Sequence, residues 1–194
     1  MSLIELMVGI AIVALLFALA APSFGTWIQN SRIRTTAESI QDGLMLTRGE
    51  AVRRNTDVRF QLTTTLDSNC ALSTSGTNWV INLGLYDPTG ACGNPSADPG
   101  DPNPPAPGII QVRAGAQGTI NALVDASQSL IVFNGLGRLT PVPAGNINIA
   151  ISNPIGGSCV VDGGPMRCLQ VEVSPAGQVR MCDPVFPSTD PMGC

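Results

Sequence analysis

The chain has 194 residues, only 12% of them charged, and a net charge of −4 in which arginine is the sole basic residue type. This acidic balance argues against a protein that coats nucleic acid by contacting its phosphates. Histidine is absent, so the commonest general base and metal ligand is missing. Nucleotide-binding and hydrolase motifs are also absent from the sequence, and we therefore expect neither an enzyme nor a cofactor.

The first 28 residues are predicted to form an apolar helix. Leu6–Ile28 carries no charge, and at about 1.5 Å of rise per residue it spans roughly 35 Å, enough to cross a bilayer core. We therefore expect residues 1–28 to enter a membrane or a filament core. Pro22 should kink this helix, because its ring clashes with the carbonyl four residues earlier. A signal peptide is the alternative, but it requires a basic segment first, whereas Glu5 is acidic.

Residues 29–55 continue the helix with an amphipathic pattern. An apolar stripe recurs at helical spacing and consists of Ile33, Ala37, Ile40, Leu44 and Ala51. Thr47 occupies the one position of this stripe that is not apolar. Charged residues lie mostly off this stripe, and Glu50 and Arg54 are spaced to form an ion pair. The two halves together predict one rod that ends near Asn55.

Residues 56–194 are predicted to form a small antiparallel β domain packed on the second half of the helix, which gives an α+β fold. Strand-like runs, several of them alternating, occur at Val58–Leu62, Trp79–Leu83, Ile109–Val112, Ser129–Phe133, Ile147–Ile151, Leu169–Val173 and Val179–Cys182. The segment 87–108 is rich in proline and glycine, so it should form a long exposed loop. We expect this Pro-rich loop to present a variable outer face, and contact with a partner is one role for it.

The cysteines indicate a disulfide framework and an oxidising compartment, because their number is even and they lie in loop-like sequence. They are Cys70, Cys92, Cys159, Cys168, Cys182 and Cys194. Closeness in sequence favours Cys182–Cys194 and Cys159–Cys168 as local pairs, with Cys70–Cys92 left over; many other pairings remain open.

Metal sites are the alternative for these cysteines and for the acidic residues of the Pro-rich loop. Zinc is disfavoured because no C-x-x-C spacing occurs and no histidine is present to complete a site. Asp87, Asp98 and Asp101 match no EF-hand order, so calcium is disfavoured as well. We expect no metal.

The start of the chain, SLIELMV over residues 2–8, resembles that of mature type IV pilins and type II secretion pseudopilins. In that class a peptidase removes a short basic leader and methylates the new amino terminus. The resemblance implies a methylated amine on Met1, a Glu5 neutralised by the terminal amine of a neighbouring subunit, and a kinking role for Pro22. Met1 replaces the usual phenylalanine. We expect the numbering to begin at the processed residue; the alternative is an initiator methionine that replaces the leader.

The helix end, LTRGEAVRRN over residues 46–55, resembles the signature of the FimT/FimU/GspH branch, with Thr47 and Gly49 as departures. The resemblance implies a minor pilin that helps to initiate or cap a type IV pilus. Alternatives are a GspH-type pseudopilin, a DNA-uptake pilin of the FimT kind, or a main filament subunit. The implied partners are other pilin subunits and the inner membrane, and a tip adhesin is a further candidate. The β domain would be periplasmic before assembly and extracellular on the pilus afterwards.

The stretch GQVR at residues 177–180 resembles in part the G-R-x-R motif of DNA-receptor members of that branch. Gly177 and Arg180 match, but Gln178 replaces the first arginine and removes one phosphate contact. Acidic residues outnumber arginine nine to four beyond Leu62. We therefore favour an ordinary strand after a turn, and keep Gly177 and Arg180 as candidate DNA contacts only.

Overall fold

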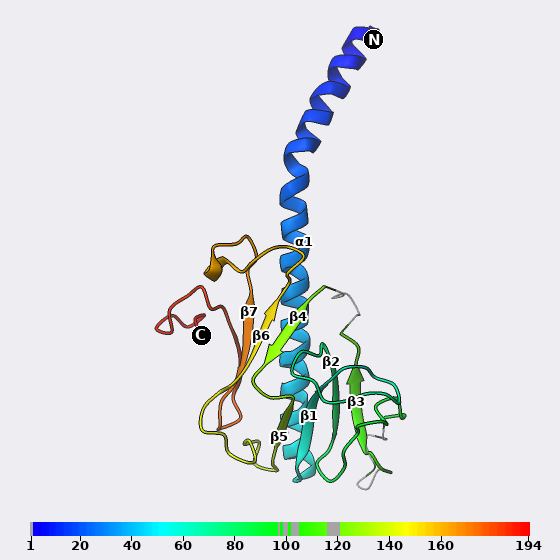
Figure 1. Cartoon of the computed structure of the whole chain (residues 1–194), viewed down its shortest axis with the longest axis vertical. Helices are drawn as coiled ribbons and strands as arrows, with labels where there is room; N and C mark the ends of the chain where they lie inside the picture. Colours follow the sequence, from blue (N-terminus) through cyan, green and yellow to red (C-terminus); the bar gives the residue numbers. More distant parts are fainter. Residues whose placement is uncertain (1, 97, 99–100, 102–104, 116–120) are drawn as a thin grey trace.

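The computed structural model describes residues 2–96, 98, 101, 105–115 and 121–194, with the backbone only for residues 17–23 (Figure 1). One helix, α1 (Leu3–Arg54), stands free over its first half and lies along a β domain over its second half (Figure 1). The helix ends at Asn55, which adopts the left-handed conformation that commonly terminates helices. The predicted continuous rod and its end are confirmed.

The packed half of α1 buries the stripe that the sequence predicts. Ile33, Ala37, Ile40, Leu44, Thr47 and Ala51 are all 0% exposed. Gly43 lies on the same side, where an added Cβ would come within 2.8 Å of the Phe60 ring and 3.1 Å of Trp79. Glycine therefore lets α1 approach the sheet closely, and the Trp79 indole N–H donates to Ser39 Oγ at 3.1 Å across this contact.

The β domain consists of two antiparallel four-stranded sheets (Figure 1). The first has the order β3-β2-β1-β5, with strands β1 (Val58–Thr63), β2 (Asn78–Leu83), β3 (Ile109–Arg113) and β5 (Leu130–Phe133). The second has the order β4-β6-β7-β8, with strands β4 (Leu123–Ala126), β6 (Ile147–Ser152), β7 (Leu169–Val173) and β8 (Val179–Cys182). Both sheets contribute buried side chains to one core shared with α1.

Two elements differ from the sequence prediction. Strand β4 was not predicted, because its four residues place Asp125 between the buried Val124 and Ala126 and give too short an alternation to recognise. A single-turn 3₁₀ helix, η1 (Val160–Asp162), follows Cys159, where the sequence predicts only strands and loops. All the strands that were predicted are present, and the α+β pilin-like fold is confirmed.

Candidate functional site

The free half of α1 is an exposed apolar surface. Its outward side chains are at least 50% exposed and comprise Leu3, Ile4, Leu6, Met7, Val8, Ile10, Ile12, Val13, Leu15 and Leu16. Contiguous apolar surfaces of this kind on a protein mark sites of contact with other proteins or with membranes. Within the described residues, no helix is both long enough and apolar enough to cross a membrane.

Glu5 lies in the first turn of α1 and is exposed. Its Oε2 accepts a hydrogen bond of 3.3 Å from the backbone N–H of Ser2. A carboxylate is favoured at this position, because the first N–H groups of a helix carry partial positive charge. The subunit alone thus leaves the carboxylate accessible to an external cation. The terminal amine of Met1 lies outside the described residues.

Pro22 lies inside α1, whose backbone is helical throughout Leu3–Arg54. The side chain of Pro22 is outside the described part of the chain, so its part in a kink stays a prediction. Figure 1 shows the free half of α1 curving away from the axis of the packed half.

The C-terminal end of α1 carries an ion cluster built from the helix-end motif. Glu50 accepts hydrogen bonds from Arg53 at 2.6 Å and from Arg54 at 2.9 Å. Burial works to raise the pKa of Glu50, but the hydrogen bonds and charges of both arginines outweigh it and hold the pKa below its ordinary value of 4.5. Arg54 also donates to the backbone oxygen of Asp101 at 2.9 Å, so the motif ties the helix end to the Pro-rich loop.

A buried amide holds the two ends of the Pro-rich loop together. Asn82, on β2, is 0% exposed, and its Nδ2 donates to the backbone oxygens of Tyr86 at 2.7 Å and Pro107 at 3.3 Å. Its Oδ1 accepts from Gln61 Nε2, on β1, at 2.7 Å. The loop therefore leaves and re-enters the domain at one fixed point. The sequence analysis missed this role, since an asparagine within a strand gives no local sign of its partners.

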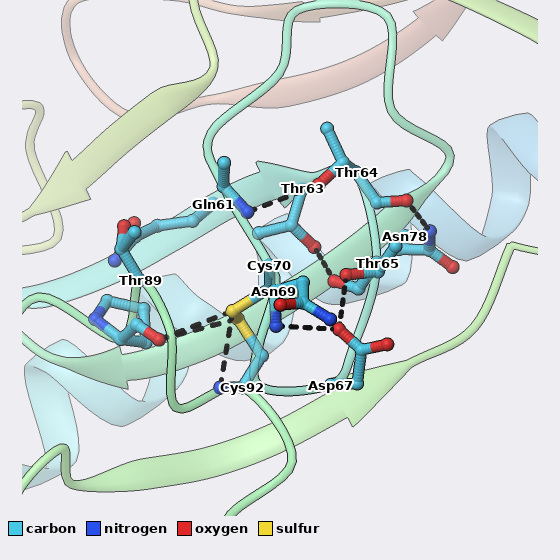
Figure 2. The surroundings of a disulfide bond; sticks show 12 residues. Gln61, Thr63, Thr64, Thr65, Asp67, Asn69, Cys70, Asn78, Thr89 and Cys92 are labelled. Carbon is cyan, nitrogen blue, oxygen red and sulfur yellow. Dashed lines mark hydrogen bonds between the residues drawn. A yellow bond between two sulfur atoms is a disulfide. The ribbon is translucent and has the colours of Figure 1, made fainter.

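The structure contains the disulfides Cys159–Cys168 and Cys182–Cys194, the two local pairs that closeness in sequence favours, and Cys70–Cys92, the pair left over. Figure 2 shows Cys70 and Cys92 beside a turn in which Asp67 accepts hydrogen bonds from Thr65 and from the backbone of Asn69. Both cysteines of this pair are buried. This bridge therefore fastens the start of the Pro-rich loop to the segment after β1.

Gly177 and Arg180, the candidate DNA contacts, both have partners within the chain. Gly177 has a φ of +82°, and an added Cβ would lie 1.9 Å from the oxygen of Gly137. Arg180 pairs with the buried Glu172 at 2.8 Å and donates to the oxygen of Gly193 at 3.1 Å. Glycine at position 177 is thus required by a turn, and Arg180 fastens β8 to β7 and to the C-terminal segment.

The C-terminal segment forms one side of a groove against α1. The groove has a volume of about 630 Å³ and lies between Trp27, Asn30, Ser31 and Arg34 of α1 and a far wall that includes Arg167, Asp183, Pro191 and Met192. Asp183 is 2% exposed and pairs with Arg167, so the charge of this buried carboxylate is compensated. The groove holds no unpaired buried charge among its described lining residues that would point to a small-molecule reaction.

Among the described residues, the side chains close enough to share a metal ion are those of Glu172, Cys182 and Cys194. These two sulfurs are joined in a disulfide and are therefore not thiolate ligands. Asp87, one of the calcium candidates, instead accepts hydrogen bonds from the backbone and side chain of Thr89. These bonds, the backbone one most strongly, hold the pKa of Asp87 below its ordinary value. The contacts of Cys182, Cys194 and Asp87 are therefore structural ones within the chain.

Comparison with known proteins agrees with this fold. The family model described as "Type II transport protein GspH" matches residues 36–177, well over half of the chain. A crystal structure of the type IV minor pilin FimU from Pseudomonas aeruginosa is similar, with a TM-score of 0.50 and 17% identity over 87% of this chain and 98% of that one. A second crystal form of FimU has a TM-score of 0.47 and 17% identity over 83% and 98% of the two chains. No curated protein matches.

The match covers most of the packed half of α1 and the β domain from β1 to β7. The chain belongs to the GspH family, and its role is the structural one of a minor pilin or pseudopilin.

Proposed function

We propose that this chain is a minor pilin of a type IV pilus. The observation that carries the proposal is the free half of α1, an exposed apolar rod with a carboxylate at its start, projecting from a GspH-family β domain. Such a rod is costly to leave in water, so it is expected to be covered either by lipid or by the same segment of other subunits. The partners proposed are therefore other pilin subunits and, before assembly, the inner membrane.

Glu5 would set the register of assembly. Opposite charges attract strongly where water is excluded, and a packed bundle of apolar helices excludes water. An incoming subunit whose Glu5 meets the terminal amine of its neighbour would therefore be held at one axial position. The carboxylate is exposed in the subunit, as such a contact requires. Its present partner, the backbone N–H of Ser2, would be exchanged for or supplemented by that amine.

The proposed locations of the chain follow from its insertion in the membrane and its later assembly into a pilus. Residues 1–28 would anchor the chain in the inner membrane, with residues 29–55 and the β domain in the periplasm. After assembly the β domain would lie on the outside of a cell-surface pilus. The disulfides agree with an oxidising compartment, because such bridges persist outside the cytosol.

A GspH-type pseudopilin of type II secretion is the second candidate. The description of the matching family favours it, and the three disulfides suit both candidates, because the periplasm and the cell surface are both oxidising. The same α1 would also serve a main filament subunit. The DNA-uptake alternative is weakened because Arg180 is held by Glu172.

The test is Glu5→Ala in a strain that lacks the native copy, with the pili sheared from the cells and analysed by immunoblot. Incorporation should fall by at least about tenfold, the equivalent of roughly 1.4 kcal/mol per subunit added. Glu38→Ala is the matched control, because Glu38 is an exposed carboxylate of α1 paired only with Arg34, in the half outside the apolar segment. Its incorporation should be unchanged.

Equal incorporation of both variants at wild-type rate would overturn the register argument. Loss of incorporation in both variants would instead point to damage of the helix. To separate a pilus from a secretion pseudopilus, deletion strains are scored for both pilus number and secretion of a type II substrate. Loss of secretion with normal pili would favour the second candidate.

A further inference from the structure

The connection between β6 and β7, residues 153–168, lies at the end of the β domain nearest the free half of α1 (Figure 1). Two hydrogen bonds fasten it to the helix at one level. Asn153 Nδ2 donates to Gln29 Oε1 at 2.7 Å, and the backbone N–H of Arg167 donates to Asn30 Oδ1 at 2.7 Å. Gln29 and Asn30 directly follow the uncharged run Leu6–Ile28.

This connection is stiff. Cys159–Cys168 closes it, and the backbone N–H of Val160 donates to the oxygen of Met166 at 2.7 Å. Met166 is 0% exposed and reaches into the core, where an added Cβ on Gly156 would lie 2.2 Å from its sulfur. The side chains that point outward from this connection are therefore held at a fixed height against α1.

Those outward side chains are apolar. Ile155, Val160 and Val161, which we call the hairpin tip, are 68%, 43% and 58% exposed. Asp162 is the one charged residue between Asn153 and Met166, so the tip carries no cation of its own. None of the residues of η1 is buried, and the fold itself gives no reason for two adjacent valines to face outward here.

We propose that the hairpin tip rests in the lipid–water interface of the membrane before assembly. This inference depends on the membrane anchorage given under the proposed function. If Leu6–Ile28 crosses the bilayer, Gln29 and Asn30 stand at its surface, and the tip fastened to them lies at the depth of the headgroups. Apolar side chains at that depth are favourably buried, about 5–10 Å into the boundary between the headgroups and the acyl chains.

Two further observations select lipid as the occupant. Trp27, 68% exposed, lies on α1 just before the residues that hold the tip, and tryptophan is enriched at membrane interfaces. The tip itself carries no cation, and Arg167, the one arginine in the connection, already pairs with the buried Asp183, so the attraction of the tip to a bilayer is apolar and does not require anionic lipid. A tip covered by a neighbouring subunit is the rival outcome, and it predicts no contact with lipid in the isolated chain.

The test places a fluorescent reporter in the tip. The full chain carrying Trp27→Phe and Val161→Trp is reconstituted into phosphatidylcholine vesicles, with or without bromine on the upper part of the acyl chains. The remaining tryptophan, Trp79, is 1% exposed and packs in the core against α1. The matched control carries Val142→Trp, since Val142 is 72% exposed and lies in the connection that enters β6 at the opposite end of that strand.

We expect brominated lipid to remove most of the emission contributed at position 161 and none of that at position 142, equally in neutral vesicles and in vesicles that contain phosphatidylglycerol. If the chain floats with the vesicles and position 161 is not quenched, the inference is wrong while the anchorage stands. If the chain does not float, the anchorage fails and the inference fails with it. Quenching that appears only with phosphatidylglycerol would also overturn it, because the contact would then depend on a nearby arginine such as Arg167 and not on the apolar tip.

Discussion

Gly177 illustrates how a residue that matches a functional motif is explained by backbone geometry. Its φ of +82° lies in the left-handed region, and Gly137 approaches so closely that no side chain fits. The residue forms the turn before β8, and Arg180 on that strand is then aligned with Glu172 on β7. The glycine of the partial G-R-x-R match is therefore required by the turn, whether or not the chain binds DNA.

Gly177→Ala should lower the free energy of unfolding by about 2–4 kcal/mol, because it combines left-handed strain with a steric clash. Gly163→Ala is the matched control: its φ is +81°, but no atom lies within 4 Å of the added Cβ. This control should lose only about 1–2 kcal/mol, the cost of the left-handed conformation alone. Urea unfolding followed by circular dichroism measures both. Equal losses of unfolding free energy in the two variants would show that the clash with Gly137 does not contribute to the destabilisation.

At the scale of an element, the Pro-rich loop depends on a residue outside it. Its proline and glycine content predicts an exposed loop, yet its two ends are joined through Asn82 on β2. Arg54 on α1 and the Cys70–Cys92 disulfide hold it at further points. A segment that composition alone assigns to flexible sequence is thus presented from a fixed base, as an interaction surface requires.

Asn82→Leu should remove the partner of the Gln61 amide and of the Pro107 carbonyl, and one of the two donors to the Tyr86 carbonyl, which keeps Arg59. The expected loss is about 2–4 kcal/mol in the free energy of unfolding, with faster cleavage of the loop at Asp98 or Asp101 by an Asp-specific protease. Asn94→Ala, an exposed residue of the loop itself, is the control and should change neither. An unchanged cleavage rate in Asn82→Leu would mean that the disulfide suffices to hold the loop.

At the scale of the whole molecule, the distribution of charge opposes DNA binding. The net charge is −4, and the β domain sets four arginines beyond Leu62 against nine carboxylates. Two of the four, Arg167 and Arg180, already pair with Asp183 and Glu172. A phosphate backbone would therefore meet few free cations and a repulsive field.

We expect the full chain to give no mobility shift of duplex DNA at about 0.15 M salt, where surface charges are screened beyond roughly 8 Å. Arg180→Ala should leave this unchanged. Gln178→Arg places a cation two residues before Arg180, immediately ahead of β8, and should produce weak, salt-sensitive binding. Clear binding by the wild type that Arg180→Ala abolishes would make the DNA-uptake reading the better one.

The elements with local periodicity could be predicted from the sequence alone. The buried stripe of α1, its end at Asn55 and the strands with alternating residues are all present, because each depends on spacing within a single segment. Two of the disulfides, Cys159–Cys168 and Cys182–Cys194, also join cysteines that are close in sequence. Strand β4 escaped prediction because four residues are too few for an alternation to stand out.

How these elements are fastened together could be seen only in the folded molecule. The bonds from Asn153 to Gln29 and from Arg167 to Asn30 join residues 124 and 137 positions apart. Asn82 and Arg180 likewise acquire their roles from groups on other segments. A polar side chain can bond to many groups, and its spacing along the chain does not select among them. The selection is made when packing of the apolar faces brings one partner within reach and excludes water from the rest.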